Sequence, residues 1–269
     1  MELVTLPLVL AVVLLEITIG GSFVLWFIDR RREAPTGFVR LTASVGVGTA
    51  ALATALVPAL PRGDILERAG LSAGPLALFG MAIFVVLALA VIALVATFTA
   101  WPRFRGASSI AVLIGGAIAL LFAAVARPTN SPYDIFALVA LPIGALALGG
   151  SDGAMLLGHW YLVTPKLTTG PLRKAALIVF FAVLAQLLLF VVAFARSDIS
   201  MNWPVPYLIA TGIRGGVGIL MTGVIAAAAW SSAKTNTQAA TGLLYVGLGT
   251  ALAGEIAARV MFFLTGVSI

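Results

Sequence analysis

Ionisable side chains lie at six positions deep inside long apolar stretches of the sequence. They are Glu16, Asp152, His159, Arg214, Glu255 and Arg259, and Gln186 adds an uncharged polar member. A charge at such depth in a membrane is costly and by default marks a proton pathway, an ion pair or a ligand site. Carboxylates and imidazoles exchange protons, whereas arginines stay charged and need carboxylate or carbonyl partners. The residue types therefore predict either proton transfer beside a bound ligand or a buried network of ion pairs.

The carboxylates each allow two interpretations. Glu16 lies near the middle of its apolar stretch, so it is either a proton-carrying or ligand-contacting carboxylate, or one half of a salt bridge. Glu255 and Arg259 are four residues apart with the glutamate first, which is the favourable order for an ion pair within one helix. Alternatively, Glu255 titrates and pairs with Arg214 or Asp152 from another helix. Three acids against two arginines and a histidine allow near-complete mutual neutralisation.

A second candidate site involves Asp152 and the run His159-Trp160-Tyr161. Asp152 and His159 are seven residues apart, so both project from one face of a helix. A quinone ring needs a hydrogen-bond donor at its carbonyl, aromatic walls and a group that exchanges protons, and histidine can donate and exchange. The pattern favours a quinone site formed by His159, Tyr161 and Asp152. The alternative is an interfacial aromatic belt, to which we assign Trp160.

The composition excludes most other chemistry. Of 269 residues, 61% are apolar and 10% are charged, whereas an ordinary soluble domain has roughly 25% charged residues. The chain has no cysteine and one histidine. It therefore cannot by itself hold a disulfide, a Cys-ligated zinc ion, an iron–sulfur cluster, a bis-histidine haem or a multi-histidine metal site.

Eight apolar stretches are long enough to cross a membrane. About 20 residues span the hydrocarbon layer as a helix, and only helices satisfy their own backbone hydrogen bonds there. The predicted spans are 3–27, 38–60, 75–100, 108–126, 136–162, 174–195, 206–230 and 238–265. The loops between them are too short for a soluble catalytic domain. The chain is thus predicted to be an all-α polytopic membrane protein.

The basic residues predict the orientation. The loops after the first, third, fifth and seventh spans hold Arg30, Arg31, Arg32, Arg40, Arg103, Arg105, Lys166, Arg173, Lys174 and Lys234. The other loops hold Arg62, Arg68, Arg127 and Arg196, partly offset by Asp64, Glu67, Asp134 and Asp198. The positive-inside rule places the first set in the cytoplasm and both termini on the periplasmic side of the inner membrane. The net charge of +6 then reflects topology, so no nucleic-acid partner is expected.

The two halves of the sequence resemble each other. Gly20-Gly21-Ser22 and the later 36–40 segment correspond to Gly149-Gly150-Ser151 and the 169–173 segment. Gly115, Ala119, Leu120, Ala126 and Arg127 recur at identical spacing as Gly247, Ala251, Leu252, Ala258 and Arg259. The pattern predicts a four-plus-four duplication whose repeats run in the same sense. We expect two tandem four-helix bundles, formed by residues 1–130 and 131–269.

The last span carries a family-like pattern. Gly254, Glu255, Arg259, Phe262 and Phe263 form G-E-x-x-x-R-x-x-F-F, and the first span carries E-x-x-x-G-G from Glu16 to Gly21. These patterns resemble the membrane anchors of DMSO-reductase, polysulfide-reductase and Nrf-type nitrite-reductase complexes.

The resemblance implies a subunit of a respiratory complex that holds no haem or iron–sulfur cluster of its own. Such a subunit binds menaquinone or ubiquinone within the lipid bilayer and exchanges electrons with an iron–sulfur or multihaem cytochrome subunit. Proton uptake or release would then follow Glu16, Asp152, His159 and Glu255, with Arg214 and Arg259 as structural ion-pair partners and no catalytic or metal-ligating residue in the chain.

Two other functions fit the same charges. One is a proton-coupled secondary transporter, although the repeats of such carriers are commonly inverted. The glycine pairs at 20–21, 149–150 and 215–216 favour it, since close backbone approach and broken helices are typical of carriers. The other is a structural subunit whose charges only hold the helices together.

Overall fold

The computed structural model describes residues 5–30, 34–129, 131, 133–164, 167–196, 198–199 and 202–269. Arg31, Arg32 and Lys166 of the predicted cytoplasmic set lie outside these residues. Within the described residues the fold consists of helices and contains no strand.

Eight spans are long and apolar enough to cross a membrane, which confirms the predicted fold class. Seven are α1 (Leu6–Asp29), α2 (Thr36–Leu56) with the 3-10 turn η2 (Val57–Ala59), α4 (Ala73–Ala96), α5 (Pro102–Val125), α6 (Ile135–Val163), α7 (Gly170–Ala195) and α10 (Thr237–Thr265). The remaining span comprises α8 (Val205–Gly212), the π-helical segment η3 (Ile213–Met221) and α9 (Thr222–Ser232). A short helix, α3 (Asp64–Arg68), lies in the loop between α2 and α4.

Local chemistry explains where the helix boundaries differ from prediction. α4 ends four residues early, where the hydroxyls of Thr97 and Thr99 donate to the carbonyls of Leu94 and Ala96. α5 begins six residues early, because Pro102 suits the first turn of a helix, where its missing N–H has no helical partner to lose.

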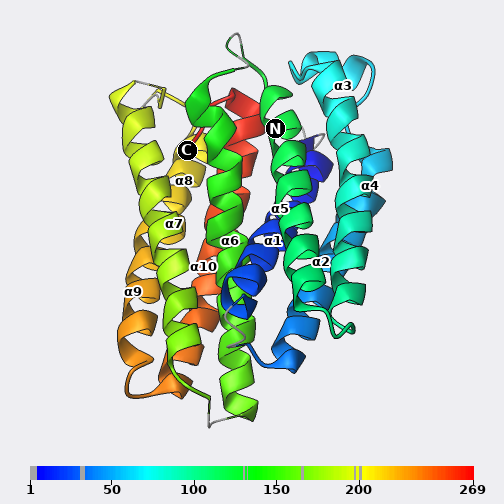
Figure 1. The fold of residues 1–269 in the computed structure, drawn as a ribbon. Helices are drawn as coiled ribbons and strands as arrows, with labels where there is room; N and C mark the ends of the chain where they lie inside the picture. The colour runs from blue at the N-terminus through cyan, green and yellow to red at the C-terminus, as the bar shows by residue number, and fades with distance from the viewer. Residues whose placement is uncertain are drawn as a thin grey trace.

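The helices form two four-helix bundles side by side (Figure 1). In the first, α1, α2, α4 and α5 pack in a ring; in the second, α6, α7, the α8–α9 span and α10 do the same. α1 and α6 make the most extensive contact in the chain and join the bundles. Figure 1 shows α2, α4 and α5 on one side of this pair and α7, α8 and α9 on the other. The division into two folding units at residue 130 stays a prediction.

The contact between α1 and α6 is reciprocal. A Cβ added to Gly20 would lie 2.7 Å from the Cα of Gly149, and one added to Gly149 would lie 2.6 Å from the Cα of Gly20. The Gly20 Cβ would also overlap the Ala145 carbonyl, and the Gly149 Cβ that of Glu16. Gly20 and Gly149, like Glu16 and Ala145, are 129 residues apart. An approximate two-fold axis between the parallel helices α1 and α6 produces this arrangement.

Other paired contacts agree with a duplication. Ser22 and Ser151, again 129 residues apart, each donate to the carbonyl four residues earlier, at 2.8 and 2.7 Å. Arg40 stacks over the ring of Phe98, and its counterpart Arg173 stacks over Trp230. The two halves therefore share local contacts as well as sequence patterns.

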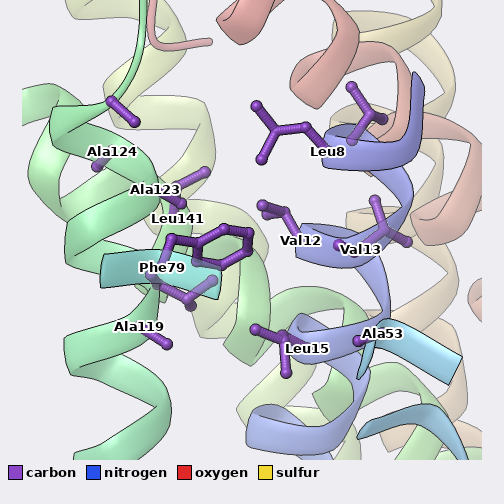
Figure 2. Packing of buried hydrophobic residues seen from close by; sticks show 14 of the residues in the cluster. Leu8, Val12, Val13, Leu15, Ala53, Phe79, Ala119, Ala123, Ala124 and Leu141 are labelled. Atoms are coloured by element: carbon purple, nitrogen blue, oxygen red, sulfur yellow. The ribbon is translucent and has the colours of Figure 1, made fainter. Parts of the chain in front are cut away.

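The cores of the two bundles differ in polarity. Apolar side chains fill the first bundle, where Leu15, Ala53, Phe79 and Ala123 gather around the inner face of α1 (Figure 2). The repeat spacing aligns Ala53 with Gln186 and Ala123 with Glu255. Polar residues thus occupy positions in the second bundle that hold buried alanines in the first.

The two ends of the molecule differ in charge. At the end where α1 stops and α2 starts lie the described residues Arg30, Arg40, Arg103, Arg105, Arg173, Lys174 and Lys234, and we call it the basic end. Both chain termini lie at the opposite end (Figure 1). The identity of the membrane and the cytoplasmic position of the basic end stay predictions.

Candidate functional site

Four helical segments bring five polar side chains together in the interior. Arg214 Nη1 lies 2.7 Å from Glu255 Oε1, Arg259 Nη2 lies 2.5 Å from Glu255 Oε2, and Arg259 Nε lies 2.7 Å from Glu16 Oε1. The side-chain amide of Gln186 also donates to Glu255. We call these five residues the buried network. Its ion pairs run from η3 through α10 to α1, so both interpretations of Glu255 hold: it pairs within its helix and across the bundle.

The buried network is sealed from solvent by protein. Its five residues are between 0 and 2% exposed. When ionised, the two glutamates balance the two arginines, which makes the charge of the network neutral. A buried ion pair persists only with good geometry and further hydrogen bonds, and loss of one partner costs about 3–5 kcal/mol. Glu255 meets that requirement, since it accepts from three donors.

Glycines allow the helices to approach closely around the buried network. A Cβ on Gly144 of α6 would overlap the Arg259 guanidinium and lie 2.8 Å from Glu255 Oε2. One on Gly254 of α10 would overlap the Cα of Gly218 in η3. The first glycine makes room for the charges, and the second lets α10 approach η3. The sequence analysis missed Gly144, because nothing distinguishes it from the other glycines of its span.

Arg214 lies in the first turn of the π-helical segment η3. The hydroxyl of Thr222 donates to the carbonyl of Val217, five residues earlier, at 3.2 Å. Gly215 and Gly216 follow Arg214, and glycine weakens the preference for a regular helix. Because π-helical turns are rare and frequently occur at functional sites, η3 marks this part of the span as specialised.

The buried network keeps unused hydrogen-bonding capacity. Glu16 Oε2, Gln186 Oε1 and Arg214 Nε are buried and have no hydrogen-bond partner among the described residues. Two of these atoms are acceptors, so they can receive hydrogen bonds or protons from a hydroxyl group.

An apolar groove of about 450 Å³ lies between α1, α6 and α7, and we call it the membrane groove. Phe23, Phe27 and Phe181 form aromatic walls, and Lys174 lies at the basic end. Towards the middle of the membrane the lining includes Ile143 and Ala185. The eleven residues from Lys174 to Ala185 correspond to about 16 Å of helix.

The membrane groove ends beside the buried network. Ile143 is adjacent in sequence to Gly144, which the network covers, and Ala185 is adjacent to Gln186, which belongs to it. Glu16 projects from the same face of α1 as Phe23 and Phe27, seven and eleven residues later.

Asp152 lies apart from the buried network. It is eight residues beyond Gly144, about 12 Å along α6 towards the basic end. Its side chain is 8% exposed and faces α1, where Oδ2 lies 3.8 Å from the position of a Cβ on Gly21. Asp152 makes no hydrogen bond or ion pair with another residue that the structure describes.

His159 and Tyr161 lie near the basic end on different sides of α6. The exposed His159 makes a 2.8 Å hydrogen bond through Nδ1 with the Tyr245 hydroxyl. Tyr161 is buried and donates to the carbonyl of Thr168 at 2.5 Å. The structure therefore does not bring His159, Tyr161 and Asp152 together in one contact.

The described part of the chain contains no group of three His, Cys, Asp or Glu side chains arranged to hold a metal ion. The chain matches no protein-family model, no curated protein and no solved structure.

Proposed function

We propose that this chain is the quinone-binding membrane subunit of an oxidoreductase complex, as its resemblance to respiratory membrane anchors implies. Quinone or quinol would enter the membrane groove from the lipid and exchange protons with the buried network. Electrons would pass to or from an iron–sulfur or multihaem cytochrome subunit. The carrying observation is that an apolar, aromatic-walled groove ends beside buried carboxylate and amide oxygens with unused acceptor capacity.

The chemistry of the substrate fits this arrangement. Quinones combine a flat ring with a long apolar tail, so they require apolar walls together with a few polar contacts. Oxidation of one quinol to quinone releases two protons and two electrons. In our proposal Glu16 Oε2 accepts a proton from the quinol hydroxyl, and Phe23 and Phe181 flank the ring. The electrons go to the partner's cofactor, since this chain has no cysteine and one histidine.

We further propose that Asp152 and His159 continue the proton route. Asp152 is the next buried carboxylate along α6, and the His159–Tyr245 pair lies about 10 Å beyond it at the basic end. In this arrangement His159 exchanges protons with water, and Tyr161 fixes the loop after α6. Direct contact of His159, Tyr161 or Asp152 with the ring stays a prediction.

The test uses the native complex and two tryptophan substitutions in α7. Ala185→Trp fills the membrane groove, whereas Leu188→Trp places the same side chain on the exposed face of the same helix. We expect Ala185→Trp to lower bound quinone and quinol oxidation at least about tenfold, equivalent to about 1.4 kcal/mol. Leu188→Trp should change neither. Equal quinone content in both variants would overturn the placement of the ring.

A proton-coupled carrier is the second candidate, and η3 favours it. Irregular helices at the membrane midplane are typical of transporter binding sites. The purified native protein separates the two proposals. Co-purification with a redox subunit and quinone supports the first. A chain that purifies alone, contains no quinone and drives proton-dependent solute uptake in vesicles supports the second.

A further inference from the structure

A cavity at the basic end lies between the end of α1 and the start of α5. Its volume is about 260 Å³, and its lining includes Arg30, Arg103, Arg105 and Asp29. The ion pair between Arg105 Nη2 and Asp29 Oδ2, at 3.1 Å, ties the two helices together. Three cations against one carboxylate leave the cavity with an excess of positive charge.

The other two arginines are available to a ligand. Arg30 stacks on Phe27, with its guanidinium carbon 4.3 Å from the ring centroid, and forms no ion pair with another described residue. Arg103 is exposed and also has no carboxylate partner among the described residues. The planar guanidinium forms two parallel hydrogen bonds with phosphate oxygens, so a pair of such groups at one cavity suits an oxyanion.

The surroundings place this cavity at the level of lipid headgroups. Trp101 and Phe98 beside it are 73% and 64% exposed, and such aromatic side chains concentrate at the membrane–water interface. α5 begins at Pro102, so the positive end of its helix dipole also faces the cavity.

The second bundle lacks the same combination. At the repeat spacing, Arg103 and Arg105 correspond to Thr235 and Thr237, and Arg30 corresponds to His159. The concentration of charge is therefore a property of this corner of the molecule rather than of the repeated fold.

We propose that the cavity formed by Arg30, Arg103 and Arg105 between α1 and α5 binds a phosphate group. The phosphodiester of an anionic phospholipid is one source, and free phosphate is the other. Basic pockets between membrane helices bind anionic headgroups in this manner. The site is separate from the membrane groove and does not depend on the proposed redox function.

The experiment compares two double variants of the full chain in nanodiscs. Arg30→Gln/Arg103→Gln removes both available guanidinium groups and leaves the Arg105–Asp29 pair intact. Arg62→Gln/Arg68→Gln removes two exposed arginines at the opposite end and is matched in charge. Bound phospholipid is counted by native mass spectrometry after exchange from phosphatidylcholine discs into discs containing phosphatidylglycerol. Elution as a single folded species is required of both variants.

We expect the wild type and the Arg62/Arg68 variant to retain phosphatidylglycerol in preference to phosphatidylcholine. The Arg30/Arg103 variant should lose about tenfold or more in apparent affinity, because charge-assisted hydrogen bonds are lost. Displacement of the lipid by millimolar inorganic phosphate would assign the site to the free ion. The proposal is overturned if the Arg30/Arg103 variant retains the lipid as the wild type does. It is also overturned if neither phosphatidylglycerol nor phosphate binds and a partner subunit cross-links to this corner.

Discussion

At the residue scale, the two glutamates of the buried network are held very differently. Glu255 accepts from Arg214, Arg259 and Gln186, whereas Glu16 accepts from Arg259 through one oxygen. Glu255 is thus the structural centre of the ion pairs. Glu16, which has a buried oxygen without a partner among the described residues, is the carboxylate better placed to exchange a proton with a ligand.

Neutralising each glutamate should therefore have unequal effects. Glu255→Gln leaves two buried guanidinium groups facing one carboxylate, and we expect a loss of about 3–5 kcal/mol in unfolding free energy. Glu16→Gln should cost less, because Arg259 keeps its contact with Glu255. Thermal and denaturant unfolding of the purified protein in detergent measures both. The opposite order of stability would show that Glu255 is not the centre of the network.

At the element scale, η3 and α10 form the closest contact of the site. Their backbones meet at Gly218 and Gly254, one residue before Glu255, so the position of the Arg214–Glu255 pair depends on this approach. α6 contributes in a different way, since Asp134 at its start accepts from the Phe136 amide and from Arg196. The two ends of the second bundle are thus fixed by different kinds of contact.

Enlarging Gly218 should separate η3 from α10. Gly218→Ala places a Cβ against the Gly254 Cα, and we expect a loss of about 1–3 kcal/mol in unfolding free energy. The proposed quinol oxidation should fall as well. Gly216→Ala is the control within the same segment, because its Cβ would meet no other atom within 4 Å. If both variants unfold alike, the effect comes from glycine content and not from the contact.

Asp134 should make stability depend on acid pH. Burial alone would raise the pKa of Asp134, but hydrogen bonds from Arg196 and the Phe136 amide lower this pKa below its usual value. The folded pKa is then below the unfolded value of about 3.9, so the stabilisation is present above that pH and is lost as the pH falls through the folded pKa. The unfolding temperature should fall less between about pH 5 and 3 in Asp134→Asn than in the wild type. Asp64→Asn, an exposed change at the same end, should follow the wild-type curve.

At the scale of the whole molecule, two similar bundles have taken different roles. The first has an apolar core and contributes Glu16 alone to the buried network, whereas the second contributes the other four residues. The reciprocal contact of Gly20 with Gly149 joins the bundles along α1 and α6. The site therefore depends on the junction as well as on either bundle.

The junction should respond symmetrically to substitution. Gly20→Ala and Gly149→Ala each force α1 and α6 apart, so we expect similar losses of unfolding free energy, about 1–3 kcal/mol. The double variant should cost less than the sum, because residues in contact are not independent. Strict additivity in denaturant titrations would contradict a shared contact.

Hydropathy was sufficient to predict the eight spans, because membrane thickness imposes the length of each helix. The pairing of Glu255 with Arg259 also followed from spacing within one helix. The partnership of Arg259 with Glu16 did not, since it requires knowing that α1 and α10 are neighbours. Nor did η3, because glycine pairs at 20–21 and 149–150 lie in regular α-helix. The membrane groove results from side-chain packing between three helices, which no local pattern records.

The ion pair between Glu16 and Arg259 has a consequence for the order of synthesis. The two residues are separated by 243 positions, and the first helix leaves the ribosome long before the last. At about 5–20 residues per second, roughly 10 to 50 seconds of translation lie between them. During that interval the first helix carries a carboxyl group without its counter-ion. The final helix to be inserted supplies the counter-ion and closes the structure, so maturation of the site waits for the end of the chain.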